Sequence, residues 1–445
     1  MVTDLTTGKP GRVLLNFTIP MFISVIFQQM YSLADSIIAG KFAGENALAA
    51  VGASYPITMI FMAIALGCNV GCSVVISQLF GAKRFTQMKT AISTTIIASL
   101  GVSLVLTAFG LLFCNPLMRL IHTPANIFED SALYLRIYVA GLVFVFLYNV
   151  ATGVFTSLGD SKSPLYFLIG LSVGNIVLDY IFVRFLKMGV AGVAWATFIA
   201  QGLACILALF TLLKRYRAIE SKQIPDRFSW VMFRTISIVA IPSILQQSFV
   251  SVGNMFVQGL INSYGSSVIA GYSAAMKLNT FGITAFGTLG NAMSSFTAQN
   301  IGAGKHDRIQ KGYKADSAIA IGIALLFFAA YFILPDQFMG LFLNSDSSQA
   351  LSTGRQFLRI VSPFYVVVCM KLVTDGVLRG AGAMLCFMTT TFSDLILRVV
   401  LAFILSFAMH SEVGIWLSWP IGWTIGTALS LYFYFTKKWK RKSLA

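Results

Sequence analysis

Charge is scarce in this chain. Aspartate, glutamate, lysine and arginine together make up 11% of its 445 residues, whereas soluble proteins carry roughly 25%. Hydrophobic residues account for 57%, and the mean hydropathy is +0.80. Too few polar side chains are available to cover a water-facing surface, so the sequence excludes an ordinary soluble domain and indicates a membrane protein.

The alternation of apolar and polar residues that marks a membrane β-strand is also missing. Apolar runs of around 20 residues recur instead, and a helix of that length crosses a hydrocarbon core of about 30 Å. The sequence therefore predicts an all-α polytopic membrane protein with twelve transmembrane helices in two pseudo-symmetric six-helix bundles. These helices are expected to begin near Leu14, Ala47, Thr90, Leu133, Pro164, Val190, Ile236, Val268, Ala315, Gln356, Leu385 and Val413.

Residue types that carry catalysis and metal binding are few. There are three histidines and six cysteines, and the cysteines lie in or beside apolar runs. Cys68 and Cys72 are one helical turn apart, but no histidine or carboxylate lies nearby, and a buried cysteine usually acts as a small hydrophobe. No Ser/His/Asp set, His-x-x-x-His pair or phosphate-binding loop is present. We expect no enzyme activity, no disulfide framework, no organic cofactor and no certain metal site.

The formal charge of +16 could suggest nucleic-acid binding, but its distribution favours membrane topology. Most lysines and arginines fall in segments that an even number of spans places in the cytoplasm, as the positive-inside rule requires. The heaviest clusters are the central loop and the tail, and the first apolar run is too long for a signal peptide. We expect a multi-pass protein of a bacterial plasma membrane, with both termini cytoplasmic, in contact with lipid and not with nucleic acid.

The chain repeats itself at roughly half its length. Gln78-Leu79-Phe80-Gly81-Ala82 is echoed by Gln299-Asn300-Ile301-Gly302-Ala303, and Gly153-Val154-Phe155 by Gly376-Val377-Leu378. A repeat of six spans gives parallel halves related by an axis along the membrane normal. We predict a first lobe at 1–213, a cytoplasmic linker at 214–234, a second lobe at 235–436 and a basic tail at 437–445.

Ionisable residues inside apolar spans are costly and usually functional. Lys371 with Asp375, and Asp394 with Arg398, are spaced to pair within one helix, so a structural pair and a transport role both stay open for these four. Asp35 and Asp179 have no basic residue within one turn. Such carboxyls can exchange a proton or, as hard oxygen ligands, bind Na⁺. The alternative is a buried structural carboxyl.

Several of these residues together resemble a known family. Pro20 followed by Asp35 and Gly40, the Gln-x-x-Gly-Ala loop, and Gly174-Asn175-x-x-x-Asp179 with Ala196-Thr197 are similar to the multidrug and toxic compound extrusion (MATE) family, in its bacterial DinF-like or MepA-like branch. The resemblance covers essentially the whole chain. It implies two lobes around a central cavity, in a MATE/MOP-like fold.

The resemblance also implies roles for single residues. The first-lobe ion cluster would contain Asp35, Asn175, Asp179 and Thr197, with Tyr134 as a weaker match, and these residues would also hold Na⁺ if sodium is the coupling ion. Pro20 matches a proline at which the first helix bends. Some branches have a carboxylate in span seven where this chain has Asn254 and Gln258, which argues against a sodium site of that type in the second lobe. The expected substrate cavity comprises Gln28, Tyr31, Asn149, Asn254, Gln258 and Asp375.

The expected function is efflux of cationic, amphipathic organic compounds in exchange for H⁺ or Na⁺ by rocker-switch alternating access. Such a protein would confer drug resistance by exporting xenobiotics. The alternative is a flippase for lipid-linked oligosaccharides or other lipids, but that function favours an arginine-rich cavity, and the first half offers chiefly carboxylates. A monomer is expected because each lobe already has a partner within the chain.

Overall fold

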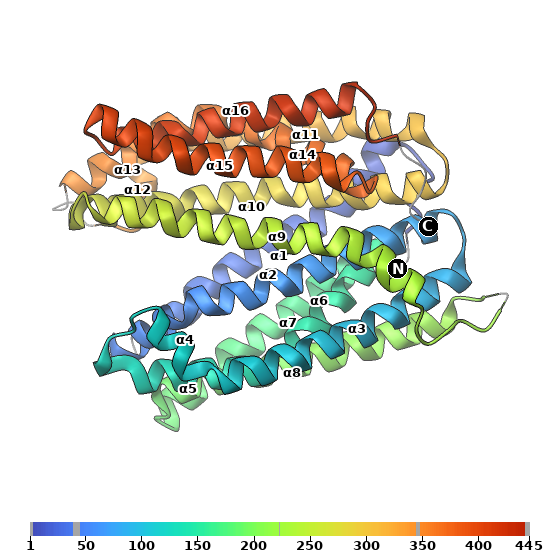
Figure 1. Ribbon diagram of the computed structural model, residues 1–445, viewed down its shortest axis with the longest axis horizontal. Helices are drawn as coiled ribbons and strands as arrows, with labels where there is room; N and C mark the ends of the chain where they lie inside the picture. Colours follow the sequence, from blue (N-terminus) through green and yellow to red (C-terminus); the bar gives the residue numbers. More distant parts are fainter. Residues whose placement is uncertain (1–2, 39–44, 222, 344–347, 441–445) are drawn as a thin grey trace. The chain divides into compact units, whose positions relative to one another are not determined.

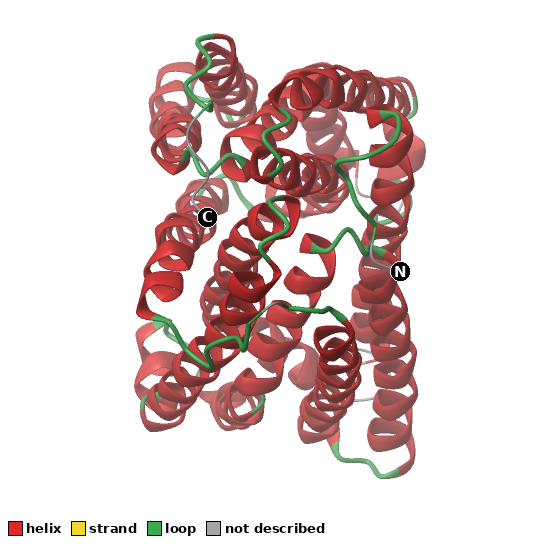
Figure 2. Cartoon of the chain, turned by 90° about the vertical axis from the view of Figure 1, so that its right-hand side faces the viewer, coloured by secondary structure: helices red, strands yellow, loops and turns green. Residues whose placement is uncertain are grey.

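The computed structural model describes residues 3–38, 45–221, 223–343 and 348–440, except for the side chains of 33–37 and 45–48. Every regular element in this part of the chain is a helix (Figure 2). The predicted all-α class is therefore confirmed. The absence of strands follows from the sequence, because its apolar runs have no two-residue period and a lipid-embedded backbone must satisfy its own hydrogen bonds.

The helices follow one another with short connections (Figure 1). The first half contains α1 (Pro10–Ile38), α2 (Glu45–Gly81), α3 (Phe85–Leu112), α4 (Cys114–Leu120), η2 (Ala125–Ile127), α5 (Phe128–Ala140), α6 (Leu142–Ser157), α7 (Lys162–Asp179), η3 (Tyr180–Phe185) and α8 (Gly189–Ala218). The second half contains α9 (Trp230–Asn262), α10 (Ser266–Gly302), α11 (His306–Ile333), α12 (Pro335–Met339), α13 (Ser348–Val361), η4 (Ser362–Phe364), α14 (Tyr365–Gly380), α15 (Met384–Met409) and α16 (Val413–Phe435).

Nine segments of the described chain are long and apolar enough to cross a membrane, and the pair 125–140 and 142–157, bent by 47°, adds a tenth. Helices α10 and α16, of 37 and 23 residues, are also long enough to cross. They differ from the other spans in composition: α10 is rich in Gly, Ser and Thr, and α16 contains Trp, Tyr and Pro. With these two, the ten spans become the twelve that the sequence predicts.

Two compact units divide the chain by its internal contacts. Within the described residues, unit 1 comprises 3–4 and 19–247, and unit 2 comprises 5–18 and 248–440. The first part of α1 thus belongs with the second half of the chain, and the first part of α9 belongs with the first half. The contact units do not coincide with the two lobes that the 214–234 loop would separate, because α1 and α9 each contribute to both units.

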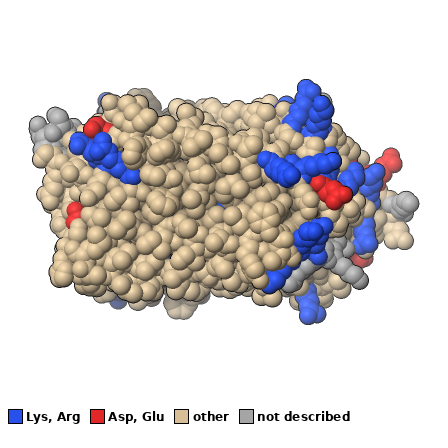
Figure 3. All heavy atoms as spheres, turned by 90° about the horizontal axis from the view of Figure 1, so that it is seen from above, with Lys and Arg blue, Asp and Glu red and all other residues tan. Residues whose placement is uncertain are grey.

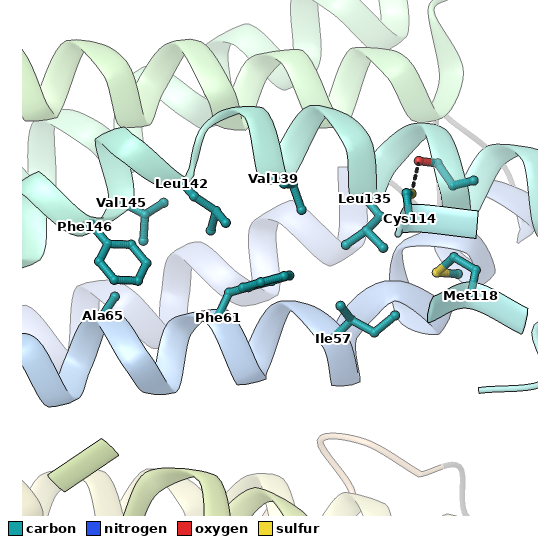
Figure 4. Packing of buried hydrophobic residues seen from close by; sticks show 11 residues of the cluster. Ile57, Phe61, Ala65, Cys114, Met118, Leu135, Val139, Leu142, Val145 and Phe146 are labelled. Carbon is teal, nitrogen blue, oxygen red and sulfur yellow. Dashed lines mark hydrogen bonds between the residues drawn. The ribbon is translucent and has the colours of Figure 1, made fainter. Parts of the chain in front are cut away.

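Unit 1 has an apolar core between α2, α4, α5 and α6 (Figure 4). Phe61 of α2 and Phe146 of α6 are almost completely buried, and Leu135, Val139 and Leu142 fill the space around them. Large apolar side chains elsewhere, such as Leu112 and Phe210, are more than half exposed. Such exposure fits a lipid-facing surface.

On the surface, charged side chains lie near the ends of the spans. On the face in Figure 3, Lys and Arg gather toward the ends and leave a broad uncharged band between them. All six cysteines are free thiols. The uncharged band is the surface that a hydrocarbon core requires.

The second copy of the repeated motif anchors the N-terminal segment within unit 2. The Leu5 N–H donates to Gln299 Oε1 at 2.9 Å, and Asn300 Nδ2 donates to the Leu5 carbonyl at 3.3 Å. Lys305 Nζ donates to the Thr6 carbonyl at 2.8 Å, and Arg308 donates to carbonyls of the same segment. The polar residues of this motif therefore satisfy backbone groups that would otherwise be buried without partners.

Helices α10 and α14 pack backbone against backbone. A Cβ at Gly376 would clash with the Gly290 carbonyl oxygen, and one at Gly290 would clash with that of Leu372. Small residues allow such close approach between membrane helices. The crossing therefore depends on glycine at these positions.

Replacing Gly376 by Ala should destabilise unit 2 by about 1–3 kcal/mol, because the new methyl group pushes two helix backbones apart. Gly287→Ala, on α10 with open space around the new Cβ, is the matched control and should leave stability unchanged or slightly raised. The measurement is the unfolding temperature of the purified proteins. Equal unfolding temperatures for the two variants would contradict this account of the crossing.

The start of α7 is fixed by a buried carboxylate. Asp160 is 1% exposed and accepts hydrogen bonds from the N–H groups of Lys162 and Ser163, at 3.1 Å each, and from the Ser163 hydroxyl at 2.8 Å. Arg215 of α8 forms an ion pair with it. Burial alone would raise the pKa of this carboxyl, but the Ser163 hydrogen bonds and the Arg215 charge outweigh burial and lower the pKa below its usual value.

This lowered pKa predicts a pH-dependent stability. The carboxylate contributes fully above the unfolded pKa of about 4, and its contribution is lost as the pH falls through the lower folded value. Asp160→Asn should cost about 1–3 kcal/mol at neutral pH, and its difference from the wild type should shrink on acidification. Unfolding temperatures measured from neutral pH downward test this. A difference that stays constant at every pH would show that the charge is unimportant.

Candidate functional site

An amide in unit 1 links three helices. In the orientation that satisfies both ends of its side chain, Asn175 donates to Asp179 Oδ2 at 2.7 Å and to the Tyr31 hydroxyl at 3.0 Å. Its oxygen accepts from the Thr197 N–H at 3.0 Å. Asn175 and Asp179 are both 0% exposed. The four residues form a buried polar cluster across α1, α7 and α8, which we call the amide cluster.

The local sequence explains this geometry. Asn175 and Asp179 are four residues apart on α7, so they share one helix face. Helix α7 ends at Asp179, and the next six residues, Tyr180–Phe185, form a π-helical turn. Such turns shift the side-chain register of a helix and are frequent at functional sites. The sequence analysis did not anticipate this turn.

Tyr134 lies beside the amide cluster. It comes from α5 and lines a cavity of about 10 Å³ together with Thr197, Tyr138 and Gln201, which is the room of roughly one water molecule. Tyr134 also packs against Val183 and Val193. The structure therefore places Tyr134 and Thr197 on one small cavity.

Two residues predicted to be functional, Asp35 and Pro20, lie on α1. The side chain of Asp35 lies outside the described residues, and position 35 follows Tyr31 by one helical turn. Pro20 lies inside the continuous helix α1, and its carbonyl accepts from Ser24 Oγ at 2.9 Å. It also lies two residues after the position at which α1 passes from unit 2 to unit 1. Because proline removes one backbone hydrogen bond, it marks a point at which this helix can bend.

The predicted cavity residues do not share one environment. Gln28 and Asn254 are exposed. The Asn149 amide donates to the Val145 carbonyl of its own helix at 2.9 Å, and the Gln258 amide donates to Asn262 at 2.9 Å. Tyr31 is hydrogen-bonded to Asn175 and therefore belongs to the amide cluster. Their part in substrate binding stays a prediction.

Asp375 lies in a buried ion network in unit 2. It is 4% exposed, its Oδ2 lies 2.8 Å from Lys371 Nζ, and its Oδ1 accepts from Thr390 at 3.0 Å and Ser430 at 2.6 Å. Lys371 Nζ is also 3.7 Å from Asp394. The predicted pair of Lys371 with Asp375 is therefore formed.

The predicted pair of Asp394 with Arg398 is not formed within the described residues. Asp394 lies nearer to Lys371, and the Arg398 guanidinium lies over the Trp419 ring at 4.3 Å from its centroid. The i, i+4 spacing allowed this pair, but contacts from other helices decide the partners. We call Lys371, Asp375, Asp394, Thr390 and Ser430 the lysine network.

One buried acid was missed by the sequence analysis. Asp316 on α11 is 0% exposed, and neither of its oxygens has a hydrogen-bond partner among the described residues. It stands at the start of an apolar run, close to Lys311 and Lys314, where the predicted span begins near Ala315. A charge at a span end is not unusual, but helix α11 begins earlier, at His306, and Asp316 therefore lies well inside the helix.

A duplicated bundle of spanning helices with buried polar clusters is typical of membrane transporters. A family model described as MatE matches residues 20–181 and 242–404, one match in each half. The matches begin 242 − 20 = 222 residues apart, in agreement with the repeat. The chain therefore belongs to the MATE family, whose members are transporters and not enzymes.

Individual relatives match this chain over most of its length. The "Probable multidrug resistance protein YpnP" of Bacillus subtilis is 28% identical over 448 residues, covering 99% of this chain and 98% of that protein. The "FAD transporter" of Shewanella oneidensis is 25% identical over 372 residues, covering 82% and 79%. A solved structure of a multidrug resistance MATE family transporter in an outward-facing conformation aligns with a TM-score of 0.92 at 25% identity, covering 98% of both chains.

Proposed function

We propose that this protein is an ion-coupled exporter of organic compounds, and that the amide cluster together with Asp35 is its coupling site for H⁺ or Na⁺. The observation that carries the proposal is the buried carboxyl of Asp179, which is joined through one amide to α1 and α8. A charge change at such a carboxyl alters the hydrogen bonds of all three helices. An ion can thereby act on the packing of unit 1.

The coupling is a competition between two ligands. Loading of the carboxyls with an ion favours one packing of the first lobe, and substrate in the cavity favours the other. Each ligand must bind one conformer better, since equal affinity for both shifts no population. Movement of the two lobes in a rocker-switch cycle, with the 214–234 loop as linker, then exposes the cavity to one side of the membrane at a time.

The stoichiometry sets the driving force. Exchange of one proton for one monovalent cation moves no net charge, so the membrane potential does not contribute. Each pH unit then supplies about 1.4 kcal/mol, which corresponds to a tenfold concentration ratio. Two protons per substrate would add the membrane potential as a second source.

Substrates are proposed to be amphipathic organic cations. The chain has 38 Phe, 15 Tyr and 17 Met, and aromatic faces and thioethers attract large organic cations. The multidrug resistance name of one relative supports this class. Another relative is described as a FAD transporter, so FAD, a large organic anion, serves as the comparison ligand. A plasma-membrane location with cytoplasmic termini and a monomeric state complete the proposal.

The test uses inverted vesicles that contain the purified protein. A fluorescent organic cation and FAD are supplied separately, and a pH gradient and a Na⁺ gradient are imposed one at a time. Uptake of the cation under one gradient, and not in protein-free vesicles, supports the proposal and identifies the ion. No gradient-dependent uptake of either compound would contradict it, and uptake of FAD alone would replace the substrate class.

A further inference from the structure

We propose that Asp316 in unit 2 is a second proton-binding site, separate from the amide cluster, which exchanges its proton through the Tyr313 and Thr374 hydroxyls. The site is built from α11 and α14. Neither the predicted coupling residues nor the lysine network includes it.

The contacts of its helix show which way Asp316 faces. Three residues before it, the Tyr313 hydroxyl lies 2.9 Å from Thr374 Oγ1 on α14. Four residues after it, the Ala320 carbonyl accepts from Cys369 Sγ on α14 at 3.5 Å. Residues 313, 316 and 320 share one face of a helix. Asp316 therefore lies on the face of α11 that packs against α14, between two contacts with that helix.

The charge state follows from this position. A carboxylate here would be a buried charge in a spanning helix without a hydrogen-bond donor, which is costly. The protonated acid is neutral and does not have this cost. A metal ion would need several further oxygen ligands, and no group of three metal-binding side chains occurs in the described part of the chain. The ligand that fits is therefore a single proton.

The titratable groups near Asp316 supply no positive charge that could compensate an ionised carboxylate in place of the proton. Tyr313 on the same helix and Cys369 on α14 make the contacts before and after Asp316 along this face, and a phenol and a thiol are both neutral near pH 7. Asp375 of α14 is compensated by Lys371. Three groups on the other elements that pack against α11 are engaged elsewhere: Lys277 of α10 lies over Phe342, Arg355 of α13 pairs with Asp336 of α12, and Tyr365 at the start of α14 bonds to Asn279.

A hydroxyl route leads away from the acid. Thr374 donates to the Met370 carbonyl at 2.7 Å, so Tyr313 is the donor in its bond with Thr374. Tyr313 is 6% exposed and Thr374 is 0% exposed. Thr374 precedes Asp375 of the lysine network. Asp316 has no hydrogen-bond partner among the described residues in this conformation, but Tyr313 lies on the same helix face. Hydroxyl groups both donate and accept, so once the carboxyl turns toward Tyr313, the Tyr313 and Thr374 hydroxyls can relay its proton.

Infrared spectroscopy of the full-length protein in lipid nanodiscs tests the proton directly. The C=O band of a protonated carboxylic acid should be lost in Asp316→Asn and kept in Asp307→Asn, an exposed acid of the same helix. Asp316→Glu should shift the band, and this variant carries the test if Asp316→Asn does not fold. A spectrum unchanged by both substitutions at 316 would overturn the proposal.

Exchange with D₂O tests the route. In the wild type the Asp316 band should shift on transfer to D₂O, because the proton is exchangeable, and a band that does not shift would identify a purely structural acid. Tyr313→Phe should slow this shift at least tenfold. Tyr331→Phe, which removes another buried hydroxyl of α11 bonded to the Leu278 carbonyl, should not. Equal exchange in both variants would overturn the hydroxyl route.

Discussion

Replacing Asp179 by Asn should lower ion-driven uptake of an organic cation into inverted vesicles at least tenfold, to near the level of protein-free vesicles. Asparagine has nearly the same shape and can keep a hydrogen bond with Asn175, but it cannot gain or lose a proton and is a weaker ligand for Na⁺. The substitution thus removes the chemistry of the site and preserves its packing. Asp35→Asn should have the same effect.

The controls separate coupling from folding. Glu129→Gln, at the exposed start of α5, removes an acid elsewhere in unit 1 and should transport normally. Asp179→Asn should still bind the cation and elute as an intact protein in size-exclusion chromatography. If Asp179→Asn drives uptake at the wild-type rate, the carboxyl is structural and the coupling site lies elsewhere.

The same uptake experiment tests the Asn175 amide, whose removal should have an intermediate effect. Asn175→Ala keeps Asp179 ionisable but disconnects it from Tyr31 and from the Thr197 backbone. Ion binding would then persist while its effect on α1 and α8 weakens. Substrate uptake should fall more than proton or sodium binding does.

The fold was largely predictable because hydropathy alone locates most spans. The boundaries differ where a helix extends beyond its apolar run: α11 begins at His306 and not near Ala315, and α13 begins at Ser348 and not near Gln356. Polar residues at helix ends are in water or headgroups, so they carry no hydropathy signal. The exchange of α1 and α9 between the contact units was not predictable, because it depends on contacts far apart in sequence.

The candidate site was predictable where a polar residue stands inside an apolar run. Asn175 and Asp179 were found in this way, and the structure joins them to Tyr31, which the sequence analysis placed with the substrate cavity. The partner of Asp394 was not predictable, because spacing within one helix indicates Arg398 whereas packing between α14 and α15 supplies Lys371. Local patterns therefore identify costly charges, and only the tertiary structure shows what compensates them.

The lysine network makes the largest stability prediction. Lys371→Met should destabilise unit 2 by about 3–5 kcal/mol, because Asp375 and Asp394 would lose the ammonium that compensates them while staying less than a tenth exposed. For a unit of this size, the unfolding temperature should fall by on the order of 10 °C. Lys314→Met, an exposed lysine of α11, should cause no measurable change.

A second substitution distinguishes a structural network from a transport site. In the double variant Lys371→Met with Asp375→Asn, no net charge is lost, and Thr390 and Ser430 can still bond to the new amide. Part of the lost stability should return, because one of the two unpaired charges is removed, while Asp394 stays without its lysine. If Lys371→Met instead keeps its stability and changes the number of ions exchanged per substrate, Asp375 takes up an ion in place of the lysine, and the network belongs to the transport cycle.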